Sequence, residues 1–336
     1  MGGNNYHRRS SIIWVRRLSK LLVLSTLLLI FAGALVKSHE VGLSVPDWPT
    51  SYGYQMFAFP LSDMIGGIFY EHGHRMIAAI VGLLTLILAF SIYYTDDQLW
   101  LKKTGFFALG LVIVQGLFGG LTVLFLQPTP ISVIHALFAQ TFFMVTILIS
   151  YGLSDERAHR ISYDKVDHTA GLKIPVYWVM GLVYIQLIIG ALMRHTQSGL
   201  AIPDFPLAGG YLLPPFNQAM LNTLHAMQFD LDVPFASMSQ VVVHFLHRLG
   251  GVSVAIAVGW LSWKTYQIKD SNNRIYRQTV LLDMLLLLQI TLGAFTIWSL
   301  KEPLITSIHV VNGAIILGLS LLMVLRILPV RLQGNN

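Results

Sequence analysis

The sequence predicts an all-α membrane protein with eight transmembrane helices, arranged as two tandem, pseudo-symmetric four-helix bundles. Hydrophobic residues make up 54% of the 336 residues, charged residues make up 11%, and the mean hydropathy is +0.64. A chain of this composition is too apolar for an ordinary water-soluble domain. Eight charge-poor stretches give the number of helices, and an internal repeat gives the division into two halves.

Each charge-poor stretch is long enough for an α-helix to cross a hydrocarbon core of roughly 30 Å at a rise of about 1.5 Å per residue. Helix ends predicted in this way shift by a few residues. The predicted spans, in chain order, are 17–36, 73–94, 104–126, 130–152, 174–194, 241–264, 276–299 and 303–327.

The distribution of the 22 Lys and Arg residues predicts the orientation of these spans, because basic residues are retained on the cytoplasmic side. Seventeen of them fall before the first span, in the even-numbered loops or in the tail, whereas Lys37, Arg194 and Lys301 fall on the other side. Both termini are therefore expected in the cytoplasm, and the long loops 37–72 and 195–240 outside. This topology accounts for the net charge of +6, so nucleic-acid binding is not inferred.

Two further features limit the function. The basic start, apolar run and Phe31-Ala32-Gly33-Ala34 could form a cleaved secretory signal, but a similar helix end recurs at Gly190–Arg194, where a signal makes no sense. The chain has no cysteine, which excludes disulfides, thiolate-ligated iron, iron–sulfur clusters and cysteine nucleophiles.

The internal repeat relates the first four spans to the last four. Gly33–Lys37 and Gly42–Pro49 align with Gly190–Arg194 and Gly199–Pro206 at an offset of 157 residues, and later motifs align at offsets of 173 and 174. A duplication with one loop insertion explains these offsets. Because each copy has an even number of spans, both copies point the same way. The predicted domains are 17–152 and 174–327, joined by a cytoplasmic linker over 153–173.

Both copies carry two histidines near the predicted outer ends of their second and fourth spans. His74 aligns with His247, and His135 aligns with His309. Imidazoles that face each other across a bundle are usual ligands of haem iron, and ionisable groups in a membrane indicate function. The repetition favours one shared task over four unrelated interior histidines. A zinc site is the main alternative, but two imidazoles per bundle lack the three or four ligands that zinc takes.

Glu71 precedes His74 by one helical turn, and its counterpart in the second copy is His244. Two interpretations are open. Glu71 could cap a helix N-terminus, where the helix dipole favours a carboxylate. Alternatively, the first bundle performs chemistry that needs a carboxylate beside a porphyrin, and the second bundle only carries electrons.

Basic residues repeat at the outer surface, where the inside-positive rule disfavours them. Arg75 and Arg248 follow the histidines of the second spans, and Lys37 and Arg194 end the first span of each copy. Charge-assisted pairing with haem propionates explains their position, with Lys37 and Arg75 on the first haem and Arg194 and Arg248 on the second. Contact with lipid phosphates is the alternative.

Together these residues resemble the heme A synthase family, and the resemblance covers the chain from Gly33 to about Arg326. It rests on five motifs: Glu71-x-x-His74-Arg75, Gly42-Leu43 through Asp47-Trp48-Pro49, His135, Gly199-Leu200 through Asp204-Phe205-Pro206, and His247-Arg248 with His309. The resemblance implies a plasma-membrane oxidoreductase that converts a ring methyl of haem O to the formyl group of haem A in two steps, for assembly of terminal oxidases.

Carried over by position, the resemblance implies roles for individual residues. His247 and His309 would be the axial ligands of a resident haem b, and His74 and His135 would hold the iron of the substrate haem. Glu71, with that first histidine pair, would form the catalytic site, acting by proton transfer or by stabilising positive charge. Many bacterial members carry cysteine pairs in the outer loops, and this chain departs from them in having none.

The resemblance also implies partners: the lipid bilayer, haem O, a neighbouring haem O synthase (a farnesyltransferase) and an electron-transfer partner that the sequence does not identify. A homo-oligomer is left open. A haem with two protein imidazoles has no free position for dioxygen, so the resident haem is expected to pass electrons.

Two other functions fit part of the pattern. A di-haem b-type electron-transfer cytochrome explains the four histidines equally well, but not a carboxylate in one copy only. A transporter built from parallel repeats would need polar or broken helices at mid-membrane, whereas these histidines lie near the outer ends.

Overall fold

The computed structural model describes residues 2–158, 170–269 and 273–328, and this part of the chain is helical apart from its loops. Two isolated β-bridges, Ser51 with Tyr54 and Ala208 with Tyr211, close tight turns in the two long loops. The predicted linker over 153–173 lies partly outside the described residues, because 159–169 are not among them.

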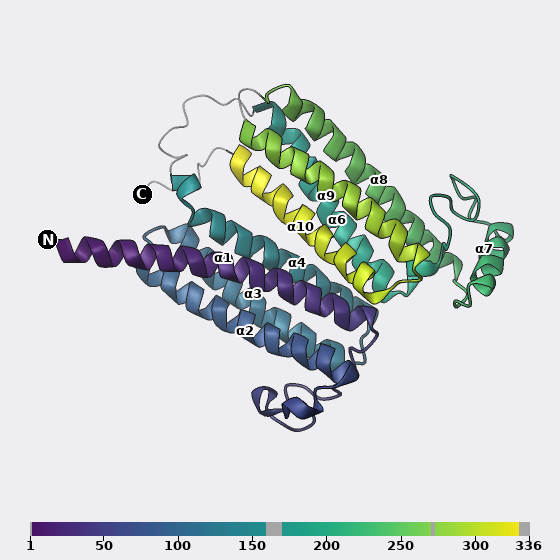
Figure 1. Cartoon of the computed structure of the whole chain (residues 1–336), viewed down its shortest axis with the longest axis horizontal. Helices are drawn as coiled ribbons and strands as arrows, with labels where there is room; N and C mark the ends of the chain where they lie inside the picture. The colour runs from purple at the N-terminus through teal and green to yellow at the C-terminus, as the bar shows by residue number, and fades with distance from the viewer. Residues whose placement is uncertain (1, 159–169, 270–272, 329–336) are drawn as a thin grey trace.

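The longer helices are numbered in chain order (Figure 1). They are α1 (Gly2–Ser38), α2 (Gly66–Thr95), α3 (Leu99–Leu124), α4 (Thr129–Gly152), α6 (Lys173–His195), α7 (Gln218–Asp230), α8 (Met238–Tyr266), α9 (Asn273–Trp298) and α10 (Pro303–Ile327). Short 3-10 turns cover Met56–Ala58, Leu61–Asp63, Ala170–Leu172 and Ser198–Leu200.

Eight of these helices are long and apolar enough to cross a membrane, which confirms the eight predicted spans. The chain is therefore a multi-pass membrane protein. Helix α1 begins at Gly2 and not at residue 17, and α2 begins at Gly66 and not at residue 73. Glu71 thus lies inside the helix, and the interpretation of Glu71 as an N-terminal cap is wrong; the N-cap residue is Ile65. A further helix, α7, lies within the second long loop.

Local sequence explains where several helices begin. Ser237 and Gln240 form a reciprocal capping box at the start of α8. At α10, Pro303 stands at the first position, and the Glu302 carboxylate accepts a hydrogen bond from the Ile305 N–H at 2.7 Å. At α7, Asn217 accepts from the Met220 N–H at 2.9 Å. These caps satisfy N–H groups that have no partner within the helix.

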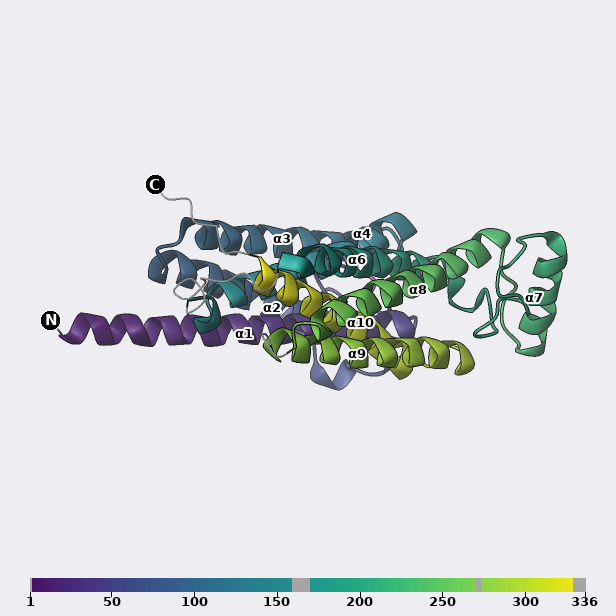
Figure 2. The same ribbon diagram turned by 90° about the horizontal axis from the view of Figure 1, so that it is seen from above.

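The helices of each half pack mainly on one another. In the first half, α1 contacts α2 and α4, and α3 contacts α2 and α4; in the second, α6 and α9 each contact α8 and α10. Figure 1 shows these two groups side by side, and Figure 2 shows the same helices from above, with α7 beyond the end of the others. Each group has its own buried apolar cluster, around Leu22, Leu88 and Phe142 in one and Val179, Leu261 and Leu317 in the other.

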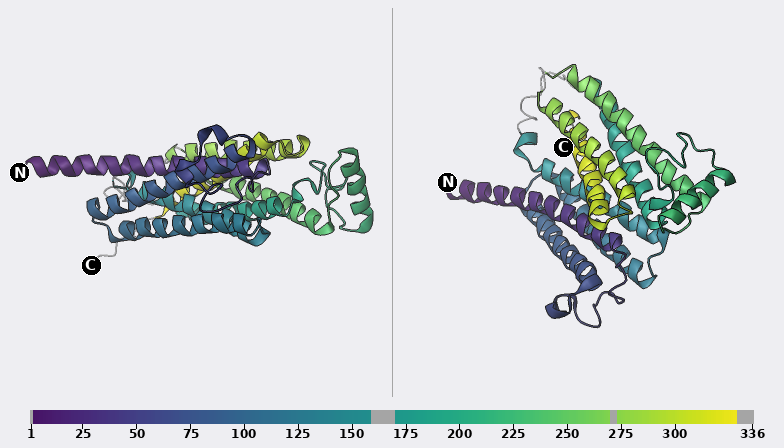
Figure 3. Two further views of the ribbon diagram at one scale, coloured as in Figure 1. Left: turned by 90° about the horizontal axis from the view of Figure 1, so that it is seen from below. Right: turned by 45° about the vertical axis from the view of Figure 1, so that its right-hand side comes forward.

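Contacts between the halves are made by α10 against α1 and α4, and by α4 against α6. The views of Figure 3 also show α10 between the other helices of the second half and those of the first. Near the end of α10, Arg326 pairs with Glu156 at 2.8 Å, and Arg274 pairs with the same carboxylate at 2.9 Å. This end lies opposite the two long loops (Figure 1).

The close contact between α10 and α4 gives a test of the interface. A methyl group added at Gly318 would lie 2.7 Å from Ile147 Cδ1 and 3.0 Å from Phe143 Cε1. We expect Gly318→Leu to lower the free energy of unfolding by about 1–3 kcal/mol through overpacking. The control is Gly259→Leu on α8, where an added methyl meets nothing within 4 Å. Thermal unfolding in detergent measures both variants, and equal melting temperatures would contradict this account.

Candidate functional site

The four histidines singled out by the repeat share one packing arrangement. Each ring lies against a glycine of the preceding membrane-spanning helix in its half: His74 on Gly33, His135 on Gly119, His247 on Gly190 and His309 on Gly293. A methyl group added at these glycines would lie 2.9, 3.2, 3.1 and 3.2 Å, respectively, from the Cε1 atom of the histidine. The glycines therefore let each imidazole approach the backbone of a neighbouring helix.

The histidines lie at similar depth. They stand six to nine residues inside the first residues of α2, α4, α8 and α10, which corresponds to about 9–14 Å at 1.5 Å per residue. His74 and His135 are within electrostatic range of each other. The rings of His247 and His309 have centroids 6.4 Å apart and planes at 62°.

This geometry suits a metal-bound macrocycle between the two rings of the second half. Metal–imidazole bonds of about 2 Å, with roughly 1 Å from each ring nitrogen to the ring centre, would separate two opposed imidazoles by roughly 6 Å. The Nδ1 atoms of His74, His135 and His309 are buried, and these rings interact with the backbone of Leu29, Gln115 and Gln289, respectively, one turn before the glycines. Within the described residues, no three His, Asp or Glu side chains gather as a metal site, which disfavours zinc.

Three glutamines hold the histidine-bearing helices, and sequence reasoning did not give them a role. Gln115 Nε2 donates to the His135 carbonyl at 2.9 Å, and Gln186 Nε2 donates to the His247 carbonyl at 2.8 Å. Gln289 Nε2 lies 3.3 Å from His309 Nε2, and its Oε1 accepts from Asn312 at 2.7 Å. A hydrogen bond donated to His309 Nε2 uses the lone pair with which this nitrogen would bind iron.

These glutamines stand one turn before the glycines that contact the histidines. Gln115 and Gln289 align in the repeat, as do their glycines, so the repeat itself was the signal that could have identified them. Gln186 aligns with Leu29, whose side chain offers no such hydrogen bond. The histidine contacts of the two halves therefore differ at one position, where the second half has Gln186 and the first half has Leu29.

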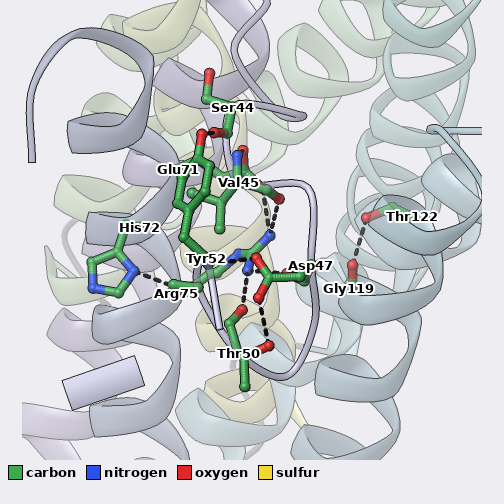
Figure 4. A network of polar contacts seen from close by, with 11 residues as sticks. Ser44, Val45, Asp47, Thr50, Tyr52, Glu71, His72, Arg75, Gly119 and Thr122 are labelled. Carbon is green, nitrogen blue, oxygen red and sulfur yellow. Dashed lines mark hydrogen bonds and ion pairs between the residues drawn. The ribbon is translucent and has the colours of Figure 1, made fainter. Parts of the chain in front are cut away.

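Glu71 and Arg75 form a buried ion pair on α2 that holds the first long loop (Figure 4). Glu71 Oε1 accepts from Arg75 Nη2 at 2.7 Å, and Oε2 accepts from the Val45 N–H at 2.8 Å. Arg75 also donates to the carbonyls of Val45 at 2.8 Å, Asp47 at 2.7 Å and Thr50 at 3.1 Å. The guanidinium thus binds loop carbonyls, and propionate binding by Arg75 stays a prediction.

The second half repeats this anchor. Arg248 donates to the carbonyls of Leu207 at 2.6 Å, Ile202 at 2.9 Å and Asp204 at 2.7 Å. His244, which aligns with Glu71, lies with its Nδ1 3.0 Å from the Ser198 carbonyl oxygen and 3.4 Å from the Ile202 nitrogen. Binding of a cofactor by Arg248 likewise stays a prediction.

Two further histidines contact the long loops. His72 is buried, and its Nδ1 lies 2.9 Å from the Ser51 hydroxyl. His225 Nε2 lies 2.9 Å from the Ala236 carbonyl oxygen in the second loop.

Asp47 fixes the turn that follows it. Its carboxylate accepts hydrogen bonds from the Gly53 N–H at 2.9 Å, the Thr50 hydroxyl at 2.5 Å and the Tyr52 N–H at 2.7 Å. Burial by itself would raise the pKa of Asp47, but these hydrogen bonds lower it to about 2. Asp204 accepts from the Gly209 and Gly210 N–H groups in the same way.

Basic groups meet at the seam between the halves, at the end that carries the loops. Arg194 Nη2 donates to the Ala34 carbonyl at 2.5 Å and to the Ser38 hydroxyl at 2.7 Å, so α6 reaches across to α1. Lys37 lies within electrostatic range of Arg194 and Lys301, and Arg194 lies within range of His309. Arg194 and Lys37 are thus brought together, and an anionic group would balance their charge.

These features define a multi-pass helical membrane protein with two pairs of glycine-packed histidines near the end that carries its long loops. The chain belongs to the COX15-CtaA family, described as cytochrome oxidase assembly protein, whose family model matches residues 54–321.

Relatives with known names span most of the chain. It is 26% identical to the heme A synthase of Shewanella oneidensis over 92% of this chain and 94% of the relative. It is 28% identical to that of Nitrosomonas eutropha over 79% and 73%, and 24% identical to that of Symbiobacterium thermophilum over 74% of each.

The lowered pKa of Asp47 predicts how the first long loop responds to pH. A carboxylate with a folded-state pKa below its ordinary value stabilises the fold above the ordinary value, and this stabilisation is lost as the pH falls through the folded-state pKa. We expect hydrogen exchange of the turn to be slower in the wild type than in Asp47→Asn above about pH 5, with the difference shrinking between about pH 4 and pH 2.

Exchange rates corrected for their intrinsic pH dependence measure this effect. Asp63→Asn, in the same loop, is the control and should leave the turn unchanged. Equal protection of Asp47→Asn and wild type at pH 6 would show that the carboxylate charge does not hold the turn.

Proposed function

We propose that this chain is a haem A synthase, a membrane oxidoreductase that oxidises a ring methyl of haem O to the formyl group of haem A. The observation that carries the proposal is the fourfold contact between a histidine and a glycine, with a 6.4 Å ring separation in the second half, in a member of the COX15-CtaA family. The names of the relatives support the same activity.

The two halves take different parts in this proposal. The second half, 174–327, holds a resident haem b between His247 and His309, and the first half, 17–152, receives haem O between His74 and His135. Bound haem supplies one-electron redox chemistry. The histidines orient the macrocycles, and their glycine contacts fix the position of each ring.

The basic groups at the seam complete the binding sites. Arg194 and Lys37 would pair with the propionates of the resident haem and of the substrate, respectively. The shortage of acids nearby supports this role: among the charged groups acting on Lys37, only Glu40 is negative. The excess of Lys and Arg at the opposite end supports an outward-facing seam, with both chain termini in the cytoplasm of a bacterial cell. A haem O synthase as neighbour and a separate electron-transfer partner complete the proposal.

The experiment that tests the function is extraction and chromatography of the bound haems, after expression with and without a supply of haem O. Haem B alone, joined by haem O and haem A when the precursor is supplied, is the expected result. Two equivalents of haem B, unchanged by the precursor, would make the protein an electron-relay cytochrome.

Histidine variants assign the two sites. We expect His247→Ala and His309→Ala to lose haem b. His74→Ala and His135→Ala should keep haem b and lose at least about tenfold in haem A formation, because each removes an axial ligand of the substrate. The control is His225→Ala in the outer loop. Loss of haem b from His74→Ala with an intact fold would reverse the assignment of the halves.

Arg194 variants test the seam. A cation near the iron disfavours the more positive oxidised state, so we expect Arg194→Gln to lower the reduction potential of the resident haem. Arg194→Lys keeps the charge and should stay close to the wild type. Spectroelectrochemical titration measures both variants, and equal potentials in all three proteins would remove Arg194 from the haem environment.

A further inference from the structure

The carboxylate of Glu71 has both of its oxygens bound to the protein. Its side chain is 4% exposed and that of Arg75 is 9% exposed. One oxygen accepts from Arg75 and the other from the Val45 N–H, at 2.7 and 2.8 Å. Figure 4 shows Glu71 and Arg75 facing the loop that carries Val45 and Asp47. A carboxylate held in this way is well placed to fix the loop and poorly placed to exchange protons with a ligand.

Hydrogen bonds from Arg75 connect the ion pair to the whole turn Val45–Thr50. Arg75 binds the carbonyls at its start, middle and end, those of Val45, Asp47 and Thr50. Buried donors and acceptors that lose their partners are costly. The position of the turn therefore depends on the hydrogen bonds of Glu71 and Arg75, and a neutral acceptor at position 71 can also make the bond to the Val45 N–H.

The turn carries Trp48, which lies against α3 beside the first histidine pair. A methyl group added at Gly120 would lie 2.4 Å from Trp48 Cδ2 and 2.5 Å from Cε2, so the indole lies directly on the helix backbone. The preceding residue, Gly119, is the one that packs on His135. Trp48 thus packs on α3 at Gly120, next to the glycine that contacts His135.

The second half performs the same anchoring without a carboxylate. His244 stands in the place of Glu71 beside Ile202, which stands in the place of Val45. Phe205 stands in the place of Trp48, with its ring centroid 6.1 Å from that of Trp298, and the residue in the place of Gly120 is Ala294. The anchor is thus a feature of both halves, and Glu71 is one of two side chains that complete it.

We propose that Glu71 is a positioning residue: it acts on the first histidine pair through Arg75 and Trp48, by holding the turn Val45–Thr50 against α3. It is not the group that transfers protons at the tetrapyrrole. This role rests on the proposed function, because it concerns how the first half receives its haem.

The test compares variants that keep or lose the hydrogen bond to the Val45 N–H. Glu71→Gln and Glu71→His keep an acceptor, and the latter copies the second half; Glu71→Ala keeps none. We expect Glu71→Ala to weaken haem binding to the first pair roughly tenfold or more, and the other two to stay within about fivefold of the wild type. Haem affinity is measured by titration of protein whose second site is already filled, and Ser62→Ala in the same loop is the control.

Trp48 supplies a second arm. If Glu71 acts through Trp48, then Trp48→Ala should weaken haem binding about as much as Glu71→Ala, and the double variant should be no weaker than the weaker single variant. Glu71→Gln should also keep the pH profile of haem A formation. Absorbance of the second-site haem checks the fold, and if Glu71→Ala does not fold, the Gln and His variants and Trp48→Ala still decide.

One pattern would overturn the proposal: Glu71→Gln and Glu71→His lose haem A formation as fully as Glu71→Ala, while haem affinity at the first pair equals that of the wild type in all three. Glu71 would then be a catalytic residue. Failure of the proposed function looks different, because the wild type would then form no haem A from haem O. The affinity and double-variant measurements would still decide how Glu71 acts on the first histidine pair.

Discussion

Close approach of an imidazole to the backbone of a neighbouring helix is the constraint on which the rest of the structure depends. At each of the four histidines, the approach requires a glycine, because a methyl group there would come within about 3 Å of the ring. In each half, two pairs of antiparallel helices must therefore pack with a fixed histidine beside a fixed glycine, near the ends that carry the long loops. The buried clusters around Phe142 and Leu317 fix the relative positions of these helices within the bundle. The anchored loops fix them at the end that carries the loops.

The two anchored loops solve a second problem, which is how a polar turn can lie against the end of an apolar bundle. A buried backbone carbonyl without a partner is costly, and a buried guanidinium without acceptors is more so. Arg75 and Arg248 meet both needs, since each binds three carbonyls of its turn. The repeated Asp47 and Asp204 close the same turns from the other side, through N–H groups. The motif of glycine, proline, aspartate and aromatic residues thus forms a turn whose carbonyls bind an arginine of the membrane-spanning helix that follows the loop.

The sequence predicted the features that depend on composition and repetition. Charge-poor length identified the eight spans, and the duplication identified the four histidines, because hydrophobicity and spacing act along the chain. Features that depend on contacts across the chain were not predictable. The repeated Arg75 and Arg248 looked like propionate ligands, yet the loop carbonyls that they bind became visible only in three dimensions. Glu71 looked like a cap because the predicted helix began too late; the segment Gly66–Tyr70 is apolar but short, and only its continuity with α2 shows that it is helical.

The halves differ in which side chains contact their histidines. In the second half, both histidines face glutamines, and Asn312 fixes one of these in turn. In the first half, Gln115 binds the carbonyl of His135, whereas His74 interacts with the backbone of Leu29 in the place that corresponds to Gln186. In the second half, the ring centroids of His247 and His309 are 6.4 Å apart. Because Gln289 uses the Nε2 lone pair of His309, this hydrogen bond must break before that nitrogen can bind a metal. The hydrogen bonds around the imidazoles thus distinguish the two halves most clearly at the place held by Leu29 in one and Gln186 in the other.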